Sequence, residues 1–80
     1  MTLRPNFVTF LKKIFELNGG EFRIIDRYQV GKELGLNLSQ TDGTVKQLCD
    51  IGMIKLIEQG RKIILTQEAL AVIDRSQTSN

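Results

Sequence analysis

Apolar residues recur at helical spacing in the first part of the chain. Between Pro5 and Asn18 they fall on one side of a helix and cover roughly half of its circumference. Pro5 suits the first helical turn, where a backbone N–H has no acceptor within the helix. Gly19 and Gly20 suit the end of the helix, because a left-handed residue at that place favours glycine. The pattern therefore predicts a helix from Pro5 to Asn18.

The breadth of this apolar face has two interpretations. A surface helix needs an apolar stripe of only about 100°, so a wider face leaves side chains for a second contact. In one interpretation the helix is the central strut of a small core. In the other, part of the face forms a dimer contact. The residues assigned to that contact are Phe7, Val8, Phe10 and Phe15.

A second helix is expected after a short strand or extended link over residues 21–25. Asp26 is expected to cap it by accepting from the N–H of Gln29, whose side chain reaches back in a capping box. Gly35 ends the helix. Gly31 lies inside it and costs about 1 kcal/mol relative to alanine, which suggests that another backbone approaches closely.

A third helix is expected to begin with Ser39 as its N-cap and to end at Gly52, after the turn formed by residues 36–38. One face of this helix carries Thr41, Val45, Leu48 and Cys49. The other face carries Gln40, Gly43, Lys46, Gln47 and Asp50. Cys49 is interpreted as a small core residue rather than a reactive thiol.

The last part of the chain predicts a hairpin and a final helix. Two segments rich in β-forming residues, 53–57 and 62–66, flank a short connection that contains Gly60, which is a hairpin signal. Thr66 is expected to cap a helix over about 67–75 with apolar residues on one face. Residues 76–80 are expected to form a frayed polar tail.

Composition and charge place the chain among small globular domains. It has 80 residues, of which 41% are hydrophobic and 25% charged, and residues 1–80 are expected to form a single domain. Its uncharged apolar runs are too short to cross a membrane. Cys49 is the only cysteine, so no internal disulfide is possible, and a reducing cytoplasm fits this composition.

The residue types that carry most enzyme chemistry are missing or dispersed. The chain has no histidine, which is the commonest general base and a frequent metal ligand. Its carboxylates are scattered, and Gly19 and Gly20 follow a helix rather than a strand, unlike a phosphate-binding loop. The single tyrosine, Tyr28, is expected to pack against the core with its hydroxyl in water. We expect no enzymatic activity, no metal and no cofactor.

The segment VGKELGLNLSQTDGTVKQLCDIGMIKLI, residues 30–57, resembles the helix-turn-helix of the winged-helix superfamily of bacterial, archaeal and phage regulators. Val30 and Gly31 match an aliphatic residue followed by a small one in the second helix. Leu48 and the Gly-Met-Ile of residues 52–54 are similar to the leucines and Gly-Leu-Ile that end the recognition helix. Residues 61–66 resemble a wing that closes into Leu-Thr before the final helix.

This resemblance, which covers residues 27–73, implies an α+β, mostly helical fold with a three-helix core, a two-stranded β-wing and a C-terminal helix. The helix-turn-helix would span about residues 26–52, the wing about 53–66 and the C-terminal helix about 67–75. The implied function is sequence-specific DNA binding by a small transcriptional regulator, which acts as a cytoplasmic, nucleoid-associated homodimer on double-stranded DNA.

Helix-turn-helix proteins read base edges with N-terminal residues of the second helix of the motif, which lies in the major groove. On this chain the resemblance assigns base contacts to Ser39, Gln40, Gly43, Thr44, Lys46 and Gln47. Arg61 and Lys62 in the wing would contact phosphate. Arg27 and Lys32 would flank the groove from the second helix.

The charge of the third helix motivates a second interpretation beside DNA binding. Residues 39–54 carry Lys46 against Asp42 and Asp50, whereas the wing carries more cations than acids. Asp42 suits the positive end of a helix dipole, but near DNA it would face phosphate at a cost unless it accepts from a cytosine amine. The alternative function is a winged-helix protein-interaction module without DNA readout, which docks a protein partner on the first helix or the wing edge.

Overall fold

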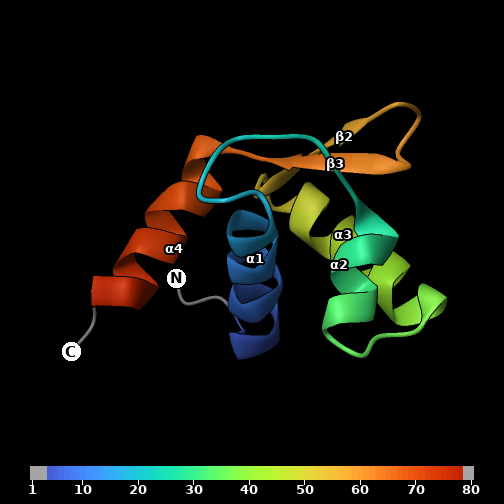
Figure 1. Ribbon diagram of the computed structural model, residues 1–80, viewed down its shortest axis with the longest axis horizontal. Helices are drawn as coiled ribbons and strands as arrows, with labels where there is room; N and C mark the ends of the chain where they lie inside the picture. Colours follow the sequence, from blue (N-terminus) through green and yellow to red (C-terminus); the bar gives the residue numbers. More distant parts are fainter. Residues whose placement is uncertain (1–3, 79–80) are drawn as a thin grey trace.

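A computed structural model describes residues 4–78, and within that range the chain forms four helices and one three-stranded antiparallel sheet. In chain order the elements are α1 (Pro5–Leu17), β1 (Ile25–Asp26), α2 (Arg27–Glu33), α3 (Leu38–Asp50), β2 (Ile54–Ile57), β3 (Lys62–Leu65) and α4 (Gln67–Thr78). Figure 1 shows α1 in the middle, α4 on one side of it and the α2–α3 pair on the other, with the sheet across one end. The fold is a small α+β arrangement.

The hydrophobic core is built from every helix and every strand. Its buried members are Phe10, Leu11, Ile14, Ile25, Val30, Val45, Leu48, Ile54, Ile63, Leu65, Ala69 and Ile73. Phe10 has no exposed surface, so its assignment to a dimer contact is wrong, because the core of the same chain already covers it. Phe7 and Phe15 are half-buried and pack against this core, and Val8 is half-buried.

The sheet has β3 in its middle, between β1 and β2. Ile54 is paired with Leu65 and Ile25 with Ile63, and all four of these side chains are buried. The predicted hairpin is therefore confirmed as β2–β3. The expected link over residues 21–25 becomes a strand only at Ile25, so that β1 adds a short third strand to the hairpin.

The capping contacts at the starts of α2 and α3 differ from those predicted. Asp26 caps α2 but accepts from the N–H of Tyr28, at 2.8 Å, rather than from Gln29. The N-cap of α3 is Asn37, which exchanges hydrogen bonds of 2.7 and 2.9 Å with Gln40 in a capping box. The assignment of Ser39 is wrong because Asn37 has a glutamine three residues further on, as this box requires.

The final helix begins as predicted and runs further. The hydroxyl of Thr66 accepts from the N–H of Ala69 at 3.3 Å, which confirms the predicted cap. α4 continues to Thr78, so the prediction of a frayed tail from residue 76 is wrong for residues 76–78, and residues 79–80 lie outside the described range. Over residues 4–78, every helix is too short or too polar to cross a lipid bilayer.

Candidate functional site

The two helices of the predicted motif are locked together at one point. A Cβ built on Gly31 of α2 would lie 2.0 Å from Oγ1 of Thr41 in α3. Thr41 is buried, and its hydroxyl donates to the carbonyl oxygen of Asn37 at 2.9 Å. The close approach predicted at Gly31 is confirmed, but the neighbour is a side chain rather than a backbone. This contact fixes the position of α3 on α2.

The outer side of α3 faces solvent along its whole length. Its exposed residues are Ser39, Gln40, Asp42, Gly43, Lys46, Gln47 and Asp50. Within residues 4–78, the side chains of Lys46 and Gln47 have no hydrogen bond or ion pair. Gln40 differs because its side chain serves the capping box, and Thr44 is half-buried with its hydroxyl donating to the Gln40 carbonyl oxygen at 2.9 Å.

Gly43 lies in the middle of this outer face. A Cβ at Gly43 would meet nothing within 4 Å, unlike one at Gly31. Glycine inside a helix is about 1 kcal/mol less favourable than alanine. No packing contact in the described part of the chain explains why a glycine stands at this place.

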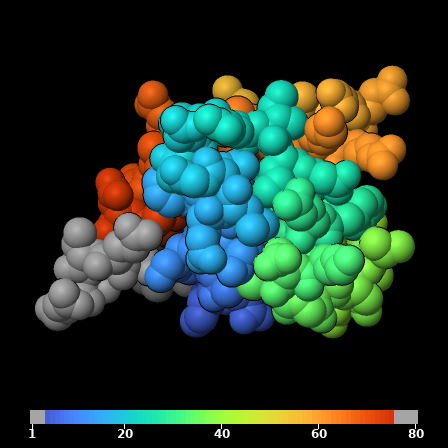
Figure 2. Space-filling model, in the orientation of Figure 1, coloured from blue at the N-terminus to red at the C-terminus, as the bar shows by residue number. Residues whose placement is uncertain are grey.

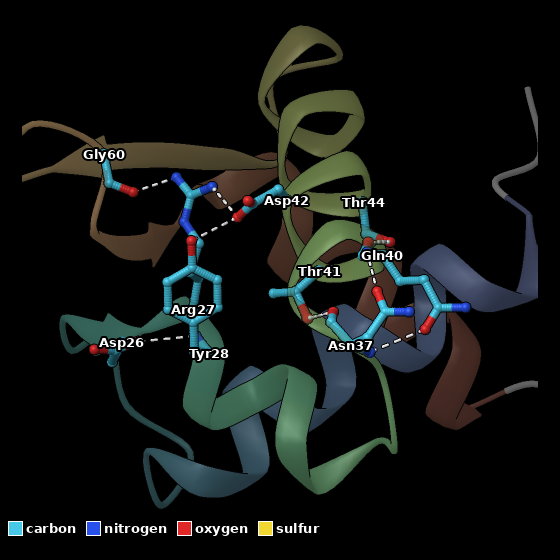
Figure 3. A network of polar contacts seen from close by, with 9 residues as sticks. All are labelled: Asp26, Arg27, Tyr28, Asn37, Gln40, Thr41, Asp42, Thr44 and Gly60. Atoms are coloured by element: carbon cyan, nitrogen blue, oxygen red, sulfur yellow. Dashed lines mark hydrogen bonds and ion pairs between the residues drawn. The ribbon is translucent and has the colours of Figure 1, made fainter.

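A polar network joins α2, α3 and the tip of the β2–β3 hairpin, as Figure 3 shows. Arg27 donates through Nη1 to Oδ1 of Asp42 at 3.2 Å and through Nη2 to the carbonyl oxygen of Gly60. The hydroxyl of Tyr28 donates to the same Oδ1 at 2.9 Å. The Arg27 side chain is only 14% exposed. One guanidinium therefore links the hairpin tip to α3.

This network places two residues differently from the sequence predictions. Arg27 was assigned to the flank of the DNA groove, but its guanidinium is committed to Asp42 and Gly60. Tyr28 was expected to pack against the core, and this prediction is wrong because its side chain is 37% exposed and lies outside the core cluster. Its hydroxyl is at the surface and donates to Asp42. None of these three contacts has a local sequence signal, since the partners lie 14 to 33 residues apart.

The other predicted cations are at the surface. Arg61 and Lys62 come from the hairpin and lie 3.7 Å from the carboxylates of Asp26 and Glu58, respectively. Exposed ion pairs contribute about 0–1 kcal/mol, so these two cations can exchange a carboxylate for another anion at little cost. Lys32 is exposed near the end of α2. Figure 1 shows the hairpin on the same side of the molecule as α2 and α3.

The hydrogen bond to Asp42 raises the pKa of the Tyr28 hydroxyl above its ordinary value of 10.0. Desolvation and the negative charge of Asp42 act in the same direction, while the charge of Arg27 opposes them. Because the folded pKa lies above the unfolded one, the stabilising contribution is present below pH 10 and is lost as the pH rises through the folded pKa.

We expect Asp42→Ala to lower the pKa of Tyr28 toward 10, because the substitution removes the hydrogen-bond acceptor and its charge. The measurement is an ultraviolet titration of tyrosinate, which reports this residue alone because the chain has one tyrosine and no tryptophan. Asp50→Ala removes an exposed carboxylate from the same helix and serves as the control. Equal pKa values in the wild type and Asp42→Ala would argue against the contact.

A scan against protein-family models and searches of curated proteins and of solved structures each found no match to this chain. Within residues 4–78, no three His, Cys, Asp or Glu side chains gather into a set that could hold a metal ion. The features available for a functional proposal are therefore the exposed face of α3, the hairpin beside it and the Arg27 network.

Proposed function

We propose that this protein is a winged helix-turn-helix DNA-binding domain of a small transcriptional regulator. In this proposal α3 is the recognition helix and the β2–β3 hairpin is the wing. The observation that carries it is the outer face of α3, which is exposed, polar and centred on a glycine that no internal packing requires. A helix surface without a Cβ allows another molecule to approach the backbone closely.

The contacts proposed for the recognition helix follow from its exposed donors. A helix fits the major groove, where lysine pairs with guanine and glutamine with adenine. Lys46 and Gln47 are available for such contacts because neither is engaged within the described residues. Ser39 and Gly43 lie on the same exposed face. Gln40 and Thr44 are less available, because both side chains hold the first turns of α3.

The proposed backbone contacts come from beside the recognition helix. Arg61, Lys62 and Lys32 would neutralise phosphates, and each such contact makes binding weaken more steeply as salt rises. Arg27 has a different role in this proposal: it holds the wing against α3 through Gly60 and Asp42. The wing position would then be set before DNA is bound.

Two observations favour the alternative of a protein-interaction module. Arg61 and Lys62 each have a carboxylate within 3.7 Å, so the wing is less positive than its sequence suggests. The first residue of α3, Leu38, is 65% exposed and offers an apolar contact beside the polar face. The sequence alone placed the partner of this alternative on the first helix or the wing edge; the exposed Leu38 would instead bring it onto α3.

The test is a fluorescence polarisation assay of the protein against a pool of random DNA duplexes at low salt. We expect binding that weakens as salt is added. Gly43→Leu should abolish binding, because its side chain fills the close approach to the helix. The same substitution should raise the free energy of unfolding by about 0.5–1 kcal/mol, since leucine is the better helix former. Loss of binding would then not result from unfolding.

Ala71→Leu is the matched control for added bulk. Ala71 is exposed on α4, and Figure 2 shows the red surface of this helix on the opposite side of the molecule from the green surface of α2 and the turn that follows it. We expect Ala71→Leu to bind as the wild type does. A wild-type protein that binds no duplex, or a Gly43→Leu variant that binds normally, would refute the proposal.

A further inference from the structure

We propose that Asp42 determines base specificity by accepting a hydrogen bond from an exocyclic amino group in the major groove, with cytosine N4 as the best fit. The inference rests on the proposed function and adds a residue to its reading surface. The two oxygens of the Asp42 carboxylate have different partners. Oδ1 accepts from the Tyr28 hydroxyl at 2.9 Å and from Arg27 Nη1 at 3.2 Å, whereas Oδ2 accepts no hydrogen bond within residues 4–78.

The two donors on Oδ1 fix how the carboxylate is oriented. Both come from α2, which is locked to α3 through Gly31 and Thr41, so the side chain of Asp42 cannot turn without breaking two hydrogen bonds. Asp42 stays half exposed in the second turn of α3 (Figure 3). Oδ2 is therefore a pre-oriented, uncommitted acceptor at the end of the helix that reads bases in helix-turn-helix proteins.

Arg27 also reduces the electrostatic repulsion between the Asp42 carboxylate and DNA phosphates. A lone carboxylate near DNA is repelled by phosphate, but the guanidinium 3.2 Å from Asp42 offsets its charge locally. The Arg27 side chain is only 14% exposed, so solvent and salt screen this ion pair less than a fully exposed one. The Arg27–Asp42 pair thus presents a hydrogen-bond acceptor without a net negative charge of its own.

The chemistry of the acceptor selects the base. An ionised carboxylate only accepts hydrogen bonds, so its partner must be a donor. In the major groove the donors are the amino groups of cytosine and adenine. Adenine carries the acceptor N7 beside its amine, and this atom would repel the carboxylate, so cytosine fits better.

The test uses Asp42→Asn, which should change the base preference because the outward atom of residue 42 becomes a hydrogen-bond donor instead of an acceptor. Arg27 and Tyr28 are both donors, so they will hold the amide oxygen in the place of Oδ1 and turn the amide nitrogen outward. The outward atom then becomes a donor, and the preferred base should change from cytosine to one with an acceptor, guanine or thymine. The measurement is selection from a random duplex library, followed by dissociation constants for the paired duplexes. We expect about 10- to 100-fold discrimination, as for one base contact.

Asp50→Asn, which changes an exposed carboxylate two turns further along α3, should keep the wild-type preference. Tyr28→Phe removes one of the donors that orient Asp42. This variant should have a weaker preference for cytosine and an unchanged affinity for unrelated duplexes. It keeps the test decisive if Asp42→Asn does not fold. An unchanged cytosine preference in Asp42→Asn and in Tyr28→Phe, or no preference in the wild type, overturns this inference and leaves the proposed function standing. A wild-type protein that binds no duplex overturns both.

Discussion

Replacing Gly31 with alanine is expected to lower the free energy of unfolding by about 2–3 kcal/mol, as for an overpacked core site. The added Cβ would lie 2.0 Å from Oγ1, 3.0 Å from Cβ and 3.1 Å from Cγ2 of Thr41. Rotation of the Thr41 side chain could move Oγ1 and Cγ2 but not Cβ, so α2 and α3 would have to separate. Urea unfolding followed by circular dichroism measures the loss.

The control for Gly31→Ala is the same change at Gly43, where a Cβ meets nothing within 4 Å. Gly43→Ala should stabilise the protein by about 0.5–1 kcal/mol, because alanine is the better helix former and no contact opposes it. Thr41→Ala added to Gly31→Ala should recover part of the loss by removing two of the three crowded atoms. A Gly31→Ala variant as stable as the wild type would contradict the close contact between α2 and α3.

Replacing Phe10 with glutamate is expected to unfold the protein. Phe10 has no exposed surface and lies in the shared core. Truncation of a buried phenylalanine to alanine costs about 3–5 kcal/mol, and an unpaired buried charge adds to that loss. A domain of this size has a total stability of only about 4–12 kcal/mol. Circular dichroism should show the loss of helix, and size-exclusion chromatography an expanded chain.

The matched control is Val8→Glu on the same helix. Val8 is half-buried and is not one of the core residues, so this variant should remain folded. If α1 forms the homodimer contact that the sequence suggested, the side chains left for it are Phe7, Val8 and Phe15, and light scattering of Val8→Glu should then show a monomer. A folded Phe10→Glu variant would contradict the placement of Phe10 in the core.

Helix positions could be predicted because their signals are local. Pro5 marks the start of α1, and Gly35 and Gly52 follow the ends of α2 and α3 with positive φ values of 75° and 81°. The cap of α3 was missed because two good capping residues, Asn37 and Ser39, compete within one turn. The choice between them depends on which one has a glutamine three residues further on.

The apolar face of α1 and the Arg27 network are two features that sequence patterns alone could not predict. Periodicity identifies the apolar side of α1, but it does not show which part of that side is buried in the core of the same chain. The sequence therefore could not decide between the core and a dimer contact for Phe10. Arg27 is 33 residues from Gly60, and only the folded chain brings them together. The exposed face of α3 was predicted correctly, because its core-facing residues recur at helical spacing.

The guanidinium of Arg27 should also reduce the conformational entropy that the hairpin loses when the protein binds DNA. The hairpin tip and α3 would be the two elements in contact with DNA, and Arg27 holds both through Gly60 and Asp42. A hairpin that is already held loses little conformational freedom when a duplex binds, so less of the interaction energy is spent on ordering it. The same tether means that the spacing between helix and hairpin is fixed in the free protein, and a duplex whose groove does not match that spacing must deform to fit.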